Sequence, residues 1–415
     1  MTPTDLTRSQ ADARSIPPTA GRGLSRRATL ILFWFGTFFF WSALYVYVPV
    51  LSVYARQMGA SLAVVGLVVG AYGLSQLLVR IPLGFWSDRI GRRRPFVLAG
   101  VVLGALGCIG LVLSSDPWLL VASRCILGLS AATWVAYSVL FASYFPLNRS
   151  AHAMSLLAFA GGAAQAISGL AGGFLSQNFG TMTAFYVGIG LAMAGMLVLL
   201  PLKEEVRPRP SAMSVDRLGA IARNPALVTG SIIAIVVTFA NFTIQQSFAP
   251  IYARQLGATD SLLGLINTAV VLGYTFSVLA GARVADAIGD RGVIALSLAL
   301  IGLPILLTPL TNNLLLVTGL QVVVGIGRGI SQPTTMSLAI RALPGHERAS
   351  GMGIYQAVYS IGMFAGPPLG GAVADALGLP SVFVLTTAFC ALGLVFALVA
   401  PALRRASVAA AQPSA

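Results

Sequence analysis

Charged residues are scarce in this chain of 415 residues. They make up 9% of it, whereas hydrophobic residues make up 57%. A soluble domain carries about 25% charged residues, because its surface faces water. The mean hydropathy is correspondingly high, at +0.85. The sequence therefore excludes an ordinary soluble protein.

Cysteine and histidine are also rare, with three and two residues. Cys108, Cys125 and Cys390 all lie in apolar runs, and their spacing matches neither a disulfide framework nor a metal site. The sequence also lacks a glycine-rich phosphate loop and a Ser-His-Asp set that could assemble in a bundle. We therefore expect no catalytic residue, no metal and no cofactor, and we do not expect an enzyme.

Long apolar runs are abundant. Each exceeds the ~18–20 residues that a helix needs to cross the ~30 Å hydrocarbon core of a bilayer. Twelve such runs alternate with loops rich in charge, proline or glycine. The sequence therefore predicts an all-α membrane protein with twelve transmembrane helices. These begin near Ala28, Ser61, Pro95, Pro117, Ala151, Thr181, Ala226, Ser261, Gly292, Asn313, Ala349 and Pro380.

The basic residues occupy one side of the predicted membrane. The formal charge is +14, and arginines cluster in segments such as 22–27, 89–94 and 203–223. The opposite side carries only Arg56 and Arg254. This is the positive-inside pattern, so both termini are expected in the cytoplasm of a bacterial cell, with the helices in its plasma (inner) membrane. The basicity thus reflects topology, and no nucleic-acid partner is expected.

The sequence repeats itself at an offset of 198 residues. The phrase "YARQMGA" (Tyr54–Ala60) returns as "YARQLGA" (Tyr252–Ala258). Six helices fit in each copy, an even number, so both copies face the same way and form two parallel six-helix bundles. The predicted division is a disordered N-terminal tail at 1–27, the first bundle at 28–202, a cytoplasmic linker at 203–225, the second bundle at 226–402 and a C-terminal tail at 403–415.

The loop after the second helix carries a recognisable motif. "GFWSDRIGRRRP" (Gly84–Pro95) resembles the signature between helices 2 and 3 of the major facilitator superfamily, and "ARVADAIGDRG" (Ala282–Gly292) is its weaker second copy. The resemblance implies two bundles that alternate access, with this loop as a cytoplasmic latch in which Asp88 caps a helix of the other bundle. The alternative is a solvated basic loop. The predicted latch residues are Gly84, Asp88, Arg89, Gly91, Arg92, Arg93 and Asp286.

A second motif narrows the resemblance. "GMFAGPPLGG" (Gly362–Gly371), in the eleventh helix, is similar to a motif of proton-driven exporters of this superfamily, which is usually noted in the fifth helix. Small residues permit close helix contact, and proline permits a bend. The alternative is tight packing alone. The predicted helix-bend residues are Gly362, Gly366, Pro367, Gly370 and Gly371.

Buried charge is the third feature. Arg124 and Arg328 fall inside predicted helices, where a charge is costly unless it faces a cavity or a partner. Arg80 is nearer an inner helix end and is expected to snorkel. All twelve acidic residues lie in tails, loops or helix ends, unlike the membrane-embedded carboxylate of many drug–proton antiporters. Proton coupling would then use Asp88, Asp375 or a proton that the substrate carries.

The resemblance implies that helices 1, 4, 7 and 10 line the substrate cavity, with help from helices 5, 8 and 11, and these helices carry aromatic and amide side chains. Such a lining suits amphipathic organic molecules. The candidates are Phe38, Trp41, Tyr45, Trp134, Tyr137, Gln165, Asn241, Gln245, Gln332, Gln356 and Tyr359.

The predicted function is secondary active export of a small-molecule substrate, neutral or anionic, with protons as the coupling ion in an antiport. The protein is expected to act as a monomer in the lipid bilayer. The alternatives are a facilitator or uptake carrier of an organic anion or sugar, a lipid flippase, and a receptor that transports nothing.

Overall fold

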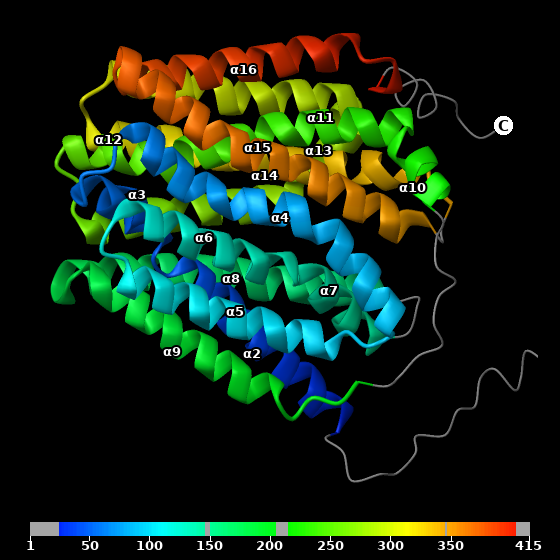
Figure 1. The fold of residues 1–415 in the computed structure, drawn as a ribbon. Helices are drawn as coiled ribbons and strands as arrows, with labels where there is room; N and C mark the ends of the chain where they lie inside the picture. The colour runs from blue at the N-terminus through cyan, green and yellow to red at the C-terminus, as the bar shows by residue number, and fades with distance from the viewer. Residues whose placement is uncertain (1–24, 146–149, 205–214, 345–346, 404–415) are drawn as a thin grey trace, which may run out of the picture.

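The structure, a computed structural model, describes residues 25–145, 150–204, 215–344 and 347–403 (Figure 1). Within these ranges twelve helical segments are long and apolar enough to cross a membrane. The predicted all-α class and the predicted number of helices are thereby confirmed. The two predicted tails lie almost wholly outside the described residues, as does much of the predicted linker.

The first half supplies six spans. They are α2 (Arg26–Tyr45) continued by α3 (Val48–Gln57), α4 (Leu62–Ile90), α5 (Arg94–Leu113), α6 (Pro117–Ala132) continued by α7 (Trp134–Ser143), α8 (Ser150–Phe179) and α9 (Thr181–Leu199). A short helix, α10 (Val215–Ala222), precedes the second half.

The second half repeats this order. Its elements are α11 (Pro225–Ala240), the π-helix η2 (Asn241–Phe248) and α12 (Ala249–Gln255), then α13 (Asp260–Leu307), the 3-10 turn η3 (Thr308–Leu310), α14 (Leu314–Arg341), α15 (Arg348–Leu377) and α16 (Pro380–Val399). α13 supplies two spans, Asp260–Gly281 and the first part of Arg283–Leu310. The sequence placed the start of the ninth span near Gly292, whereas the apolar helical segment begins at Arg283.

Helix starts follow from local capping. Asp116 accepts hydrogen bonds from the amides of Trp118 and Leu119, and Pro117 occupies the first turn of α6. Asn224 caps α11 in the same way, with a proline next to it. A capping side chain satisfies amides that the helix itself leaves free, and proline fits there because it has no amide to satisfy.

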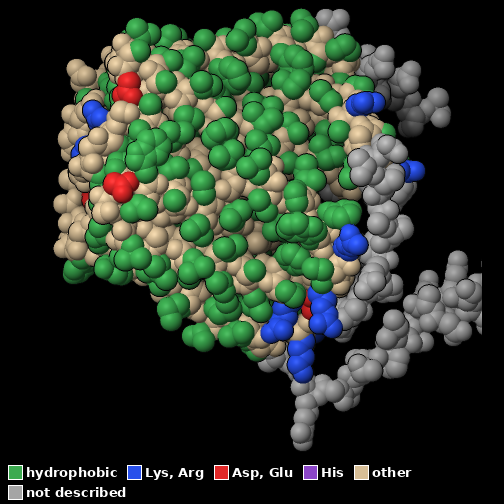
Figure 2. Space-filling view, viewed as in Figure 1, with side chains coloured by type: hydrophobic (Ala, Val, Ile, Leu, Met, Phe, Trp, Pro, Cys, Tyr) green, Lys and Arg blue, Asp and Glu red, His purple; other side chains and the backbone are tan. Residues whose placement is uncertain are grey.

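The two halves lie side by side in Figure 1, with α4 of the first half alongside α15 of the second. The first and last described helix ends and α10 lie at one end of the molecule, which we call the inner end; α3 and α12 lie at the other, the outer end. On the visible face, hydrophobic side chains cover the middle, and most Lys and Arg residues lie toward the inner end (Figure 2). A belt of this kind suits the hydrocarbon core of a bilayer.

The backbone itself carries the repeat. Every described residue with positive φ is a glycine, and these glycines form three pairs 198 residues apart: Gly59 and Gly257, Gly91 and Gly289, and Gly180 and Gly378. At Gly289, φ is +71°, which breaks the helical path of α13. A left-handed turn of this kind is open to glycine at little steric cost.

Three of the twelve spans, the first, the fourth and the seventh, are interrupted along their length. The first span breaks between Tyr45 and Val48, the fourth at Thr133, and the seventh is a π-helix over Asn241–Phe248. Interrupted and π-helical segments occur often at functional sites, because they turn side chains and backbone groups away from the regular helix surface. The centre of the molecule is therefore the first place to look for a site.

Candidate substrate site and outer closure

Arg328 lies near the middle of α14, and its side chain is half-buried. Its Nη1 donates to the side-chain oxygens of Asn241 and of Gln245, both on the π-helix. Its guanidinium carbon lies 4.2 Å from the ring centroid of Tyr274. All three partners are neutral, so the charge of Arg328 is solvated by dipoles and by an aromatic face, without a carboxylate among them.

Arg124 has a different environment. It is only 2% exposed, in α6. Its Nε donates to the carbonyl oxygen of Val68, 3.3 Å away, and its Nη1 donates to the hydroxyl of Tyr47, also 3.3 Å away. The rings of Tyr47 and Tyr72 flank the guanidinium. Arg124 therefore ties the interruption of the first span to α4, and its charge is sealed from the centre.

Arg80 corrects an expectation. It does not snorkel, because it is 4% exposed and its Nη1 crosses to the second half. There it donates to the carbonyl oxygen of Gln356 at 3.1 Å and to the hydroxyl of Tyr359 at 3.0 Å. Gln76, one turn earlier, accepts from its Nη2. This residue joins α4 to α15, a contact that sequence position alone did not indicate.

An aromatic group from the first half faces the centre. Tyr45 lies within electrostatic range of both Arg124 and Arg328. Its ring packs against Trp41, and Trp41 packs against Trp134, with centroid distances of 5.7 and 5.1 Å. Tyr45 thus stands between the two halves, at the interruption of the first span.

Most predicted cavity residues are half-buried: Phe38, Trp41, Tyr45, Trp134, Gln165, Gln245, Gln332, Gln356 and Tyr359. Two are not. Tyr137 is 0% exposed, because Phe33, Phe40 and Trp134 pack around its ring, so it supports the site from behind. Asn241 is buried beneath Arg328.

The predicted latch has partners within its own half. The carboxylate of Glu204 accepts from the backbone amides of Arg93 and Arg94 at 2.6–2.8 Å, and so caps α5. In the second copy Asp290 pairs with Arg341. Gly91 has φ +69° and ends α4. Asp286 and Arg89 are exposed. The side chain of Asp88 lies outside the described part of the structure, so its cap on the other bundle stays a prediction.

The glycine-proline motif packs α15 tightly against both halves. A Cβ on Gly362 would lie 2.3 Å from the carbonyl oxygen of Ile235, and a Cβ on Gly366 would lie 2.3 Å from Thr243. On another face, a Cβ on Gly371 would lie 2.1 Å from the carbonyl oxygen of Leu62. The glycines of the motif therefore permit close approach of the helices, and a bend at this motif stays a prediction.

Asp375 closes the outer end between α15 and α4. It is exposed, not buried, because α15 reaches the outer surface here. Its two carboxylate oxygens accept from the amides of Leu62 and Ala63, each at 2.9 Å, and Ser61 also donates to it. A carboxylate of the second half thus caps a helix of the first half, where it meets the positive end of the helix dipole.

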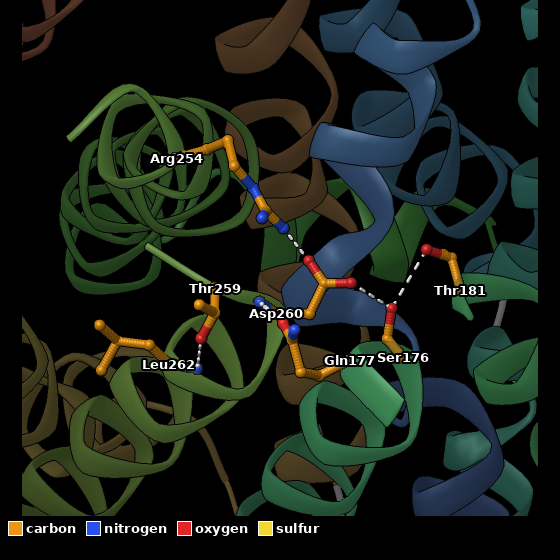
Figure 3. Close-up of polar contacts among 7 residues, drawn as sticks. All are labelled: Ser176, Gln177, Thr181, Arg254, Thr259, Asp260 and Leu262. Atoms are coloured by element: carbon orange, nitrogen blue, oxygen red, sulfur yellow. Dashed lines mark hydrogen bonds and ion pairs between the residues drawn. The ribbon is translucent and has the colours of Figure 1, made fainter. Parts of the chain in front are cut away.

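Asp260 provides the matching contact on the other side (Figure 3). Its amide donates to the side-chain oxygen of Gln177 at 3.0 Å, and its carboxylate accepts from Ser176 and pairs with Arg254. Gln177 and Asp375 are 198 residues apart, as are Leu62 and Asp260. The two contacts are therefore equivalent: the end of α8 or α15 in one half caps the start of α13 or α4 in the other.

Toward the inner end, α4 and α15 each carry a glycine that lacks the close contacts seen at the outer end. Among the described residues, a Cβ on Gly84 in α4 would meet only Val135 of its own half, at 4.0 Å. A Cβ on Gly353 in α15 would meet nothing within 4 Å. α4 and α15 therefore pack closely from the outer end as far as Arg80, and less closely at Gly84 and Gly353.

Comparison with known proteins agrees with this architecture. The family model described as Major Facilitator Superfamily matches residues 33–239 and 231–414. The chain is 25% identical over 384 residues to the multi-drug resistance efflux pump PmrA of Streptococcus pneumoniae, covering 88% of this chain and 94% of PmrA. It is 24% identical over 390 residues to the multidrug resistance protein MdtG of Escherichia fergusonii, covering 89% and 93% of the two chains.

Among solved structures, a bacterial homologue of the human lysosomal transporter Spinster, in an inward-facing and unoccupied conformation, has a TM-score of 0.77 at 17% identity, covering 94% of this chain and 99% of that one. This likeness supports the fold. Because the family model spans both halves, the chain belongs to the major facilitator superfamily and is a membrane transporter, not an enzyme.

Proposed function

We propose that the protein is a secondary active exporter of small amphipathic organic molecules, neutral or anionic, which acts as a monomer in a bacterial plasma membrane. One observation carries the proposal. Polar and aromatic residues of both halves meet at Arg80, Gln356 and Tyr359, the outer end is capped across the halves, and α4 and α15 pack less closely beyond Arg80.

Export is supported by two relatives that are named for drug efflux or multidrug resistance and align over most of their length. The chemistry of the centre favours neutral or anionic substrates, because its described charges are arginines and its other polar groups are amides and hydroxyls. We propose the proton-motive force as the energy source.

An efflux assay tests the proposal. The protein is expressed in bacteria that lack their own drug pumps, and cell-associated levels of neutral, anionic and cationic fluorescent compounds are followed with and without a protonophore. We expect lower levels of neutral or anionic compounds, reversed by the protonophore. Higher levels than in the empty-vector strain would indicate uptake and overturn the proposal, as would strong export of permanent cations alone.

A further inference from the structure

Arg80, Arg124 and Arg328 all lie inside membrane spans, and Arg328 differs from the other two in its exposure. Arg328 donates from Nη1 to Asn241 and Gln245, and its side chain also hydrogen-bonds the hydroxyl of Tyr274. None of these described partners carries a negative charge, and the side chain of Arg328 is half-buried, so a ligand can still reach the guanidinium. Arg80 and Arg124, by contrast, are 4% and 2% exposed.

Charge balance adds a second argument. The described ion pairs, Arg217–Glu347, Arg254–Asp260 and Arg341–Asp290, lie at the two ends of the molecule. None of them neutralises the charge of Arg328. A cation held within a membrane span by neutral dipoles alone is costly, and a bound anion would remove that cost.

The neighbours of Arg328 indicate the shape of such an anion. Nε and Nη2 form the planar edge of the guanidinium that matches the two oxygens of a carboxylate or sulfonate. The ring of Tyr274 lies against the guanidinium, and Tyr45, whose ring packs against Trp41, lies near it from the first half. We propose that Arg328 is the substrate-binding residue for an organic monoanion, a carboxylate or sulfonate on an aromatic body, and that the membrane potential drives its exit.

The second part of the proposal follows from the first and rests on the proposed export. A monoanion that leaves a cell with a negative interior moves down the electrical gradient. Each 100 mV then supports about a fiftyfold concentration ratio, equivalent to about 2.3 kcal/mol. Such a carrier needs no proton-carrying carboxylate in its centre, which matches the positions of the acidic residues in the sequence.

Three probes with one aromatic body test the binding step. Naphthalene-2-sulfonate, 2-naphthylmethanol and (2-naphthylmethyl)trimethylammonium differ in charge and share the ring system. Titration calorimetry on the purified full-length protein should show tightest binding for the sulfonate. Arg328→Gln should weaken sulfonate binding at least tenfold and leave the alcohol within twofold. Arg328→Lys, which keeps the charge and loses the planar edge, should be intermediate.

Arg223→Gln is the matched control, because it removes an exposed arginine at the inner end. It should bind all three probes like the wild type. Equal binding of the sulfonate by wild type and Arg328→Gln, or tighter binding of the ammonium probe, would overturn the assignment.

Proteoliposomes test the driving force. With the sulfonate inside, a valinomycin-imposed potential, negative inside, should speed its exit severalfold, whereas a pH gradient without a potential should not. Dependence on the pH gradient alone would overturn the electrical part and leave export standing. No transport of any probe, with sulfonate binding intact, would instead refute the proposed export.

Discussion

At the scale of single residues, the two arginines nearest the centre have separate tasks. Arg124 is enclosed by Tyr47, Tyr72 and the backbone of α4, and it holds the interrupted first span in place. Arg328 is half-buried and is held by the amides of the π-helix and by the ring of Tyr274. The same side-chain type thus serves structure in one half and, as proposed, ligand binding in the other.

This difference predicts opposite effects of one substitution. Arg124→Gln removes a charge-assisted bond to Tyr47 and two ring contacts, which are worth about 1–3 kcal/mol together. We expect its melting temperature in detergent to fall by several degrees and its affinity for naphthalene-2-sulfonate to stay within twofold. Arg328→Gln should leave the melting temperature nearly unchanged and weaken the binding of naphthalene-2-sulfonate. Loss of affinity in Arg124→Gln without loss of stability would assign the ligand to the first half instead.

The sequence did not predict the surroundings of two side chains, Arg80 and Tyr137. Arg80 was expected to snorkel because it lies nearer the inner end of its helix, but α15 approaches α4 there and supplies Tyr359. Tyr137 was expected to line the cavity because its helix is an inner one, but it is enclosed by Phe33 and Phe40. Both outcomes depend on which helix face turns toward which neighbour, and apolar runs that are hydrophobic all round do not encode this face.

At the scale of elements, the outer end is held by two equivalent helix caps across the halves. One cap uses a carboxylate, Asp375, and the other an amide oxygen, Gln177. The glycines next to them, Gly371 and Gly173, allow the helix backbones to touch. Each cap exists only while the outer end is closed, so its free energy contributes directly to the balance between the inward-open and outward-open states.

Asp375→Ala should therefore favour opening at the outer end. Loss of a helix cap costs about 0.5–2 kcal/mol, which shifts a two-state population about two- to thirtyfold. Spin labels at Gln57 and Gln255, both exposed near the outer ends of α3 and α12, should show a larger share of long distances. Asp375→Asn, which keeps an acceptor, should shift the distances less.

Asp116→Ala is a matched control for this experiment. Asp116 also accepts from two helix amides, but both belong to its own half. Its loss should lower stability and leave the distance between the labels unchanged. An unchanged distance in Asp375→Ala would mean that the cap contributes nothing to the outer closure.

The sequence predicted the spans better than their interior. Hydropathy fixes where a helix can cross a bilayer, so the twelve spans were found, most within a few residues of their observed starts. The π-helix over Asn241–Phe248 and the break after Tyr45 were not predicted, although a proline lies in the first turn of the helix that follows each of them. The cap by Asp375 was also missed, although the 198-residue offset could have aligned it with Gln177, because no pattern within one helix indicates a partner in the other half.

At the scale of the whole molecule, orientation is still a prediction from charge. The arginine pattern places α10 and the inner end in the cytoplasm. Cysteines at Ala222 and at Gln57, both exposed, should therefore react differently in whole cells. A membrane-impermeant maleimide should label Gln57→Cys and leave Ala222→Cys unlabelled until the cells are opened.

The native cysteines do not confuse this measurement, since Cys108 and Cys390 are buried and Cys125 is half-buried within its helix. The unmodified protein provides the background signal. Labelling of Ala222→Cys in intact cells, with Gln57→Cys protected, would reverse the assigned orientation.

The interrupted spans have a mechanical consequence. α3 and α12 contact each other at the outer end, and each is joined to its longer inner segment at the level where Tyr45, Asn241 and Gln245 lie. The joints that connect α3 and α12 to the rest of their spans therefore lie next to residues that surround the proposed ligand. A cargo that pulls Tyr45 and Gln245 together would tilt α3 and α12 before the bundles rock as whole bodies. Ligand binding and the tilt of α3 and α12 would then be coupled, because the joints and the proposed binding site share the same few residues.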